Sequence, residues 1–273
     1  MARQRRRERP VSHTAVEIEK MRTVGRFAAS LLDMVEQMIE PGITTGAIDR
    51  AVDEATRARG AISAPFGYPR GSRHPFPGHC CTSVNHVVCH GIPSDHQVLA
   101  DGDIVNVDVT PILDGFHGDT SRTFFVGRVQ PEVRRLVDDT FESMRRGIAA
   151  VRAGGTTGDI GHAIQRYAEP RGHGVVRAFA GHGVGRIFHG PPTISHVGRP
   201  GQGDRLEPGM TFTIEPMLNM GTYACSILSD HWTAVTNDGL PSAQFEHTLV
   251  VTEDGADILT LGEGRTLDLT VSD

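Results

Sequence analysis

Residues 41–60 read PGITTGAIDRAVDEATRARG, and residues 153–172 read AGGTTGDIGHAIQRYAEPRG. The two segments align without a gap at an offset of 112, and both carry the pattern G-x-T-T-G-x-I. A glycine-rich break followed by two threonines is typical of one helix ending and the next being capped. This internal repeat predicts two similar halves, over about residues 14–127 and about residues 128–262.

Amphipathic helical patterns precede both copies of the repeat. Apolar residues recur in steps of three and four, which places each set on one helical face. The first set is Met21, Val24, Ala28, Leu31, Val35 and Met38, and the second is Val133, Leu136, Thr140, Met144, Ile148 and Val151. Alternating β-branched segments follow each helix pair. The sequence therefore predicts an α+β fold in which each half reads helix, helix, strand, strand, strand.

Four carboxylates occupy two pairs of equivalent positions in the strand regions. Residues 99–109 (LADGDIVNVDV) align with residues 206–216 (LEPGMTFTIEP) and match Asp108 with Glu215. A second alignment, GDTSRTFFV with FEHTLVVTE, matches Asp119 with Glu246. Carboxylates within buried strands are costly unless they are paired or bind metal. Taken singly, each could be a solvated acid on an edge strand, but a two-fold relation between the halves would bring all four to their junction.

The hairpin signal around Leu113-Asp114-Gly115 places two of these acids near each other. In IVNVDV (residues 104–109) the valines point to one face, and Asn106 and Asp108 point to the other. The midpoint of Asp108 and Asp119 falls in the turn. We therefore expect these aspartates to lie opposite each other on neighbouring strands, close enough to share a cation.

Three of the 14 histidines in the chain are candidates for the same site as the four carboxylates. His182 lies between glycines in GHGVGRIFHG, His189 follows seven residues later, and His90 ends the segment SVNHVVCHG. Four carboxylates with one imidazole form a hard, oxygen-rich donor set that suits Mn²⁺, Fe²⁺, Co²⁺ or Mg²⁺ better than a structural zinc. We expect no role for the loop-like histidines His13, His74, His79, His96 and His196, and we expect His162 and His173 at the surface.

Charge is distributed unevenly along the 273 residues, whose formal net charge is −6. Residues 1–9 hold five arginines and one glutamate, so the remaining chain carries 22 basic and 32 acidic residues, a net charge of −10. We expect a basic, flexible tail at residues 1–13. No apolar run reaches the length of a membrane helix, and the start lacks the apolar stretch of a secretory signal. These features predict a cytoplasmic protein without a membrane partner.

The four cysteines, Cys80, Cys81, Cys89 and Cys225, form no C-x-x-C pair. Adjacent Cys80 and Cys81 would make a strained disulfide, so reduced thiols fit best. A zinc site formed by the first three cysteines and His90 is an alternative, although its spacing lacks the usual short loops.

Five motifs together closely resemble type I bacterial methionine aminopeptidases of peptidase family M24, and the resemblance runs from about residue 14 to about residue 262. They are CHGIP (89–93), GDIVNVDVTPILDGFHGDTSRTF (102–124), GHGVGRIFHGPP (181–192), PGMTFTIEPM (208–217) and SAQFEHTLVVT (242–252). The resemblance implies the α+β pita-bread fold, in which two pseudo-symmetric halves, each with helices on an antiparallel sheet, enclose a dinuclear metal centre. It also implies a single catalytic domain over residues 14–273.

The resemblance further implies a metal-dependent hydrolase that removes the N-terminal methionine of nascent polypeptides when the amine is deformylated and the second residue is small. It implies two divalent ions, of Co, Mn, Fe or Zn, with the native metal left open. Asp108 would bind one ion through both oxygens, and Asp119 and Glu246 would bridge the pair. Glu215 would relay a proton, His189 would stabilise the oxyanion, and His90 would bond near the scissile nitrogen. The implied metal ligands are Asp108, Asp119, His182, Glu215 and Glu246.

The resemblance also implies an apolar methionine pocket, but here the sequence departs from the family pattern. Pro65-Phe66 stand before Gly67-Tyr68 where relatives carry a cysteine, and an insertion, PRGSRHPFPGH (residues 69–79), follows. The effect of this insertion on the pocket is left open. By resemblance, the substrate-binding residues are His90, His189, Tyr68, Phe76, Cys81, Phe188 and Trp232.

Two other kinds of protein remain as alternatives. X-Pro aminopeptidases and prolidases share the fold but usually carry an extra N-terminal domain, whereas only the short segment 1–13 precedes the first expected helix here. Non-catalytic pita-bread binding modules lose metal ligands, whereas all five are present. We expect a monomer, and the arginine-rich tail suggests contact with the ribosome.

Overall fold

The structure is a computed structural model that describes residues 10–270. The helices in this range are α1 (Ala15–Glu36), α2 (Thr45–Ala58), α3 (Pro131–Ala149) and α4 (Thr157–Ala168), and a 3-10 turn (Glu169–Arg171) follows α4. Residues 1–9, which carry most of the predicted basic tail, lie outside the described residues. None of the helices in the described part is both long and apolar enough to cross a membrane.

Both predicted helix pairs form, and the repeat threonines cap their second helices. Thr44 precedes α2 in extended conformation, and its hydroxyl accepts the Ala47 N–H at 3.1 Å. Thr156 takes the same place before α4, where its N–H donates to the Asp159 carboxylate at 2.8 Å. The predicted apolar faces of α1 and α3 are largely buried, although Val133 is only half-buried and Met38 and Val151 lie just beyond the ends of their helices at Glu36 and Ala149.

Short antiparallel strands form five sheets within residues 10–270. In spatial order they are β2 (Cys81–Val84), β4 (Ile104–Val109) and β7 (Thr120–Phe125); β10 (Gly190–Ile194), β9 (Gly181–Gly183), β11 (Thr211–Ile214), β16 (His247–Val251) and β17 (Ala256–Ile258); β15 (Ser242–Gln244), β12 (Met217–Asn219) and β8 (Gly174–Val175); β13 (Cys225–Ile227), β14 (Ala234–Thr236) and β3 (Val87–Cys89); and β1 (Ile62–Ser63), β5 (Pro111–Leu113) and β6 (Phe116–His117).

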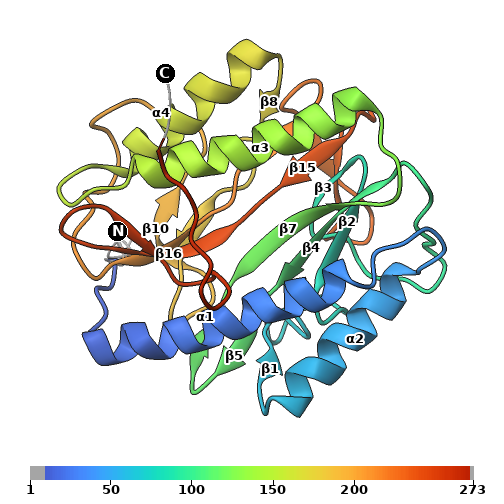
Figure 1. Ribbon diagram of the computed structural model, residues 1–273, viewed down its shortest axis with the longest axis horizontal. Coiled ribbons are helices and arrows are strands. Elements are labelled where there is room, and N and C mark those ends of the chain that lie inside the picture. Colours follow the sequence, from blue (N-terminus) through green and yellow to red (C-terminus); the bar gives the residue numbers. More distant parts are fainter. Residues whose placement is uncertain (1–9, 271–273) are drawn as a thin grey trace, which may run out of the picture.

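Each helix pair covers its own strands, and in Figure 1 α1 and α2 lie in the lower part of the view while α3 and α4 lie in the upper part. The valines of β4 face α1 and α2 in one hydrophobic cluster. Phe212 and Ile214 of β11 pack with apolar residues of α3 and α4 in another. The polar faces of β4 and β11 therefore turn away from the helices.

A buried seam joins the strands of the two halves. The Thr120 hydroxyl, beside Asp119, donates to the Glu246 carbonyl at 2.7 Å. The Thr248 hydroxyl donates in return to the Asp119 carbonyl at 2.8 Å. Ser121 and Glu246 also form a backbone bridge. The seam thus ties the main chains of two predicted metal ligands to each other.

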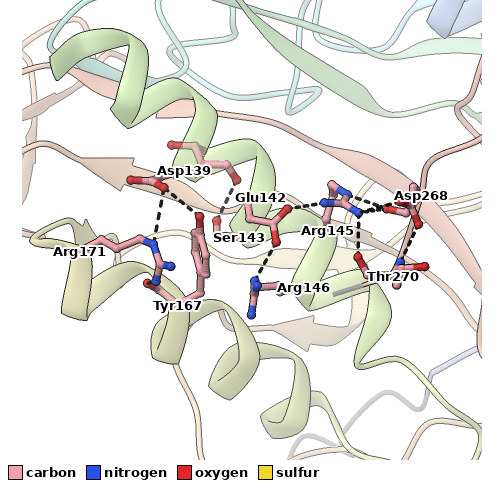
Figure 2. Close-up of polar contacts among 10 residues, drawn as sticks. Asp139, Glu142, Ser143, Arg145, Arg146, Tyr167, Arg171, Asp268 and Thr270 are labelled. Carbon is pink, nitrogen blue, oxygen red and sulfur yellow. Dashed lines mark hydrogen bonds and ion pairs between the residues drawn. The ribbon is translucent and has the colours of Figure 1, made fainter. Parts of the chain in front are cut away.

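The C-terminal segment crosses the helical side of the molecule and contacts both helix pairs. Arg265 forms an ion pair with Asp33 of α1 at 3.1 Å. Further along, the Asp268 and Thr270 carbonyls accept hydrogen bonds from Arg145 of α3, which Figure 2 shows. This segment therefore links the two halves on the side of the helices.

The helix pair of the second half is held together around a buried histidine. Asp139 of α3 accepts a hydrogen bond from the Tyr167 hydroxyl of α4 at 2.8 Å (Figure 2). The same carboxylate lies 2.8 Å from His173 Nε2. His173 is 5% exposed, so the prediction that it lies at the surface is wrong. The hydrogen bond with the Asp139 carboxylate offsets the free-energy cost of burying the imidazole. Because the two residues are far apart in the sequence, no local pattern predicts this contact.

Candidate metal centre

A cavity of about 310 Å³ lies where the two halves meet. Every residue predicted for the site lines it: Asp108, Asp119, His182, Glu215 and Glu246, with His90, His189, Tyr68, Phe76, Cys81, Phe188 and Trp232. Seven lining residues were not predicted: Pro65, Cys89, Thr110, Phe179, Ala180, Met217 and Gln244.

Three of the predicted metal ligands come closest together. One ligand atom each from Asp119, His182 and Glu246 lies within 4.8 Å of the other two, a spacing at which the three could hold one ion. His182 Nε2 is 3.5 Å from an Asp119 oxygen and 3.6 Å from a Glu215 oxygen. Asp108 faces the same cavity from β4. The halves thus contribute two carboxylates each, and the second half adds the imidazole.

The predicted pairing of Asp108 with Asp119 is wrong by two residues. Asp108 pairs with Ser121 in the β4–β7 ladder. The turn between β5 and β6 is centred between Asp114 and Gly115, both with positive φ, one residue beyond the predicted midpoint between Leu113 and Asp114. Because two residues equal one side-chain period of a strand, Asp119 still points to the same face as Asp108, displaced along it.

The carboxylates are strongly perturbed in the protein alone. Burial raises the pKa of Asp108 to about 7 and that of Glu215 to about 8. Burial, followed by repulsion from the neighbouring carboxylates, raises the pKa values of Asp119 and Glu246 well above their usual range. No lysine or arginine lines the described part of the cavity.

This charge balance fits divalent cations. Buried carboxylates without a basic partner are stabilised when they bind a metal ion, and oxygen donors suit hard divalent ions. Burial also lowers the pKa of His182 to about 4, so its imidazole is neutral and able to bind a metal at neutral pH.

Hydrogen bonds from neighbouring side chains orient the carboxylates. The Thr110 hydroxyl donates to Asp119 at 2.8 Å, and the Thr213 hydroxyl donates to Glu215 at 2.7 Å. Gln244 donates to the other Glu215 oxygen at 3.4 Å. These three groups were not predicted from the sequence. The threonines lie two residues from predicted ligands on the same strand face, and that spacing is the signal that could have found them.

His196 is a further group that the sequence analysis missed. It is fully buried, and its Nε2 accepts the backbone N–H of Glu215 at 3.3 Å. Burial lowers the pKa of His196 to about 3, which keeps the ring neutral and able to accept. His196 is 19 residues from Glu215 in the sequence, so no local pattern indicates their contact, and the expectation that His196 has no role is wrong.

His90 and His189 lie on the walls of the cavity. His90 follows β3 with a positive φ of 56°, and burial lowers its pKa to about 4. His189 is 4.2 Å from His182 between ring centroids, and its Nδ1 lies 2.9 Å from the Tyr68 hydroxyl. Burial and the neighbouring imidazoles lower its pKa to about 3. Both rings are therefore neutral near pH 7.

The rest of the cavity wall is mainly aromatic. The ring centroids of Tyr68 and Phe188 are 5.1 Å apart, and those of Phe76 and Trp232 are 5.2 Å apart, both pairs edge to face. Cys81 pairs with Asp108 between β2 and β4. All four cysteines are free, and no cysteine joins a metal-binding cluster in the described residues. The alternative zinc site is therefore wrong: Cys80 Sγ instead lies 3.7 Å from an Asp49 oxygen.

We predict that the metal-free protein loses thermal stability as the pH rises from 7 to 8. Burial raises the pKa of Glu215 to about 8 and that of Asp108 to about 7, so the folded protein holds protons on these groups that the unfolded chain releases above about pH 4. The folded state binds more protons, so the free energy of unfolding falls with pH. The buried histidines act in the opposite direction only below about pH 6.5, which sets the lower limit of the window.

Differential scanning calorimetry of the metal-free protein at pH 7 and 8 measures this effect. Each kcal/mol corresponds to roughly 2–4 °C at this chain length. Metal-saturated protein is the control, because bound carboxylates are already deprotonated. A melting temperature of the metal-free protein that rises over this range would contradict the prediction.

Comparison with known proteins places this cavity in a family context. The model of metallopeptidase family M24 matches residues 19–253. Methionine aminopeptidase A of Synechocystis is 58% identical over 247 residues, which cover 90% of this chain and 96% of that protein. The crystal structure of methionine aminopeptidase from Rickettsia prowazekii is 47% identical, has a TM-score of 0.89, and is covered over its full length by 93% of this chain.

More distant structures share the fold alone. The Xaa-Pro dipeptidase from Bacillus anthracis is 22% identical with a TM-score of 0.74, and the match covers only 62% of its length. The likeness therefore favours the methionine aminopeptidases over the X-Pro enzymes and confirms the pita-bread fold. The chain belongs to metallopeptidase family M24 and, within it, to the type I methionine aminopeptidases.

Proposed function

We propose that this protein hydrolyses the first peptide bond of nascent polypeptides that begin with a free N-terminal methionine and a small second residue. The observation that carries the proposal is one cavity lined by two sets of side chains: four carboxylates with a neutral imidazole, and a set of aromatic rings. The first set suits a metal-assisted hydrolysis, and the second suits an unbranched apolar side chain. The role places the enzyme in the cytoplasm. A monomer would suffice for this role, since one chain supplies all five predicted metal ligands together with His90 and His189.

Asp108, Asp119, His182, Glu215 and Glu246 would hold two divalent ions, of Co, Mn, Fe or Zn. When bound, such ions supply Lewis acidity and lower the pKa of water. The fit rests on the donor chemistry of the cavity, which gathers buried carboxylates with raised pKa values and no basic partner among its described lining residues.

Three residues of the chain would contact the substrate or transfer a proton during the reaction. Glu215 is held by Thr213 and Gln244, and it would carry a proton to the leaving amine. His189 would donate from Nε2 to the developing oxyanion, since its Nδ1 already meets the Tyr68 hydroxyl. His90, on the wall beside Phe179 and Trp232, would bond near the scissile nitrogen.

A peptide panel tests the function. Purified protein with added Mn²⁺ or Co²⁺ should release methionine from Met-Ala-Ser, leave Met-Lys-Ser and formyl-Met-Ala-Ser largely intact, and fail on an X-Pro peptide. Comparable rates on Met-Ala-Ser and Met-Lys-Ser would refute the second-residue preference. Release of the first residue from the X-Pro peptide alone would favour the X-Pro alternative.

Replacing His189 by alanine should lower kcat much more than it raises KM. The oxyanion forms only in the transition state, so the lost hydrogen bond is absent from the ground state. Loss of one oxyanion donor costs roughly 10²–10³ in kcat. Steady-state kinetics on Met-Ala-Ser measure the split, with the exposed His96 replaced by alanine as a matched control. A His189→Ala variant that changes only KM would disprove the role.

The arginine-rich start of the chain would dock the enzyme on the ribosome. Nascent chains emerge on a surface rich in RNA phosphate, which would repel a body with a net charge of −10. Five arginines in residues 1–9 can offset that repulsion. Binding of this kind weakens with salt, at a log–log slope of about −0.7 for each neutralised phosphate of single-stranded RNA.

Deletion of residues 2–9 should leave Met-Ala-Ser hydrolysis unchanged and weaken co-sedimentation with ribosomes at low salt. Replacement of the five arginines by glutamine keeps the length of the segment and should have the same effect. Equal co-sedimentation of the three proteins across a salt titration would rule out docking through this segment.

A further inference from the structure

The insertion at residues 69–79, here named the rim loop, is closed at its base by two reciprocal hydrogen bonds. Gly67 N–H donates to the Phe76 carbonyl, and Phe76 N–H donates to the Tyr68 carbonyl, both at 2.8 Å. Residues 69–75 are exposed, whereas Phe76 is 2% exposed and lines the cavity. The rim loop thus leaves the cavity wall at Tyr68 and returns to it at Phe76.

The rim loop is fastened to the segment that carries Trp232. The Trp232 indole N–H donates to the His74 carbonyl at 3.0 Å. The His74 ring lies against the His231 ring, with centroids 4.0 Å apart. Phe76 meets the Trp232 ring edge to face at 5.2 Å. Two of these three contacts hold the Trp232 side chain itself, and the third holds the neighbouring His231.

Hydrogen bonds within residues 230–233 hold the segment that carries Trp232 in the conformation that these contacts need. The Asp230 carboxylate accepts the backbone N–H groups of Trp232 and Thr233 at 2.8 and 2.9 Å. His231 adopts a left-handed φ of 69°, which few non-glycine residues take. The backbone is thus held in a turn that presents the His231 ring to His74 and the Trp232 ring to Phe76.

We propose that the rim loop is the specificity element of the methionine pocket, because it fixes the Trp232 indole as a rigid wall. This inference rests on the proposed function. A wall held at one orientation leaves a slot of constant width, which accepts the unbranched methionine side chain and excludes a branched side chain. A mobile indole would let the slot widen, and the enzyme would lose discrimination while keeping its chemistry. Differences in side-chain shape of this kind are worth roughly 10–200-fold in kcat/KM.

Two variants loosen the fastening without touching the cavity wall. The double substitution His74→Ala, His231→Ala removes the ring contact. A shortened rim loop, with residues 70–75 replaced by two glycines, removes the carbonyl that accepts the indole N–H. Arg73→Ala is the matched control, because Arg73 is exposed in the same loop and forms no ion pair or ring contact in the described structure.

Two measurements test the proposal. The ratio of kcat/KM for Met-Ala-Ser over Leu-Ala-Ser should fall about tenfold in both loosened variants and stay constant in Arg73→Ala. Trp232 is the only tryptophan of the chain, so its fluorescence anisotropy should fall and its quenching by acrylamide should rise in the same variants. Unchanged fluorescence would show that the rim loop does not fix the indole. A mobile indole with an unchanged ratio would show that the loop does not set specificity.

The fluorescence measurement does not depend on catalysis. Failure of the unaltered protein to hydrolyse Met-Ala-Ser would count against the proposed function. The anisotropy of Trp232 would still decide whether the rim loop fixes the indole.

Discussion

Exhaustive removal of divalent metal should abolish release of methionine from Met-Ala-Ser, and Mn²⁺ or Co²⁺ should restore it. The cavity brings together carboxylates with raised pKa values and a neutral imidazole, and no lysine or arginine among its described lining residues offers a positive charge that could replace the metal in polarising the peptide carbonyl. The loss should therefore be nearly complete. Dialysis against a chelator, elemental analysis and a peptide assay together measure it.

The fold should survive the same treatment. The predicted metal ligands lie within strands or directly beside their ends, the apolar faces of these strands pack into hydrophobic clusters, and a chain of this length buries a large core without metal. Circular dichroism of the metal-free protein should stay close to that of the loaded protein. Asp119→Asn serves as the matched variant, with lost activity at ordinary metal concentrations. Full activity in protein shown to be metal-free would exclude the mechanism.

Replacing Glu215 by glutamine should lower kcat by roughly 10²–10⁴, the usual contribution of general acid–base catalysis. The amide keeps the size of the side chain and can still meet Thr213, but it cannot take up a proton. A larger loss is expected if the substitution also weakens metal binding. The carboxylate should act in its deprotonated form, and burial without metal opposes that form by raising its pKa to about 8.

Metal content separates the two effects of this substitution. Elemental analysis of the Glu215→Gln variant shows whether ions are retained, and single-turnover kinetics at saturating metal then report on proton transfer. Gln244→Ala is a useful companion, because Gln244 makes the weaker contact with Glu215, at 3.4 Å, and should give a smaller loss. A Glu215→Gln variant that retains its metal and keeps kcat within tenfold would refute the proton relay.

Local signals in the sequence predicted the elements that depend on local interactions. Steps of three and four placed the buried faces of α1 and α3, and paired threonines marked the starts of α2 and α4, because these features involve neighbours along one chain segment. The repeat also predicted that the four carboxylates meet at the junction of the two halves. Their identity as metal ligands and the aromatic pocket came from resemblance to the family.

The register of the hairpin and the contacts between residues far apart in the sequence were not predicted. The hairpin register was off by two residues because the position of the turn is set by the backbone angles at Asp114 and Gly115, which the composition of the turn does not locate. Gln244 and His196 contact Glu215 only through the packing of separate strands and loops. The sequence likewise did not show that the 69–79 insertion reaches the Trp232 segment.

The buried seam between the halves bears on how the protein denatures. Thr120 and Thr248 each donate a hydroxyl hydrogen bond across the junction, so separating the halves would break both bonds, each worth roughly 0.5–1.5 kcal/mol, together with the backbone bridge between Ser121 and Glu246. The two halves therefore stabilise each other, and the unfolding of one half removes contacts that stabilise the other. Despite its duplicated architecture, the protein should denature in one cooperative transition, in which the calorimetric and van't Hoff enthalpies agree.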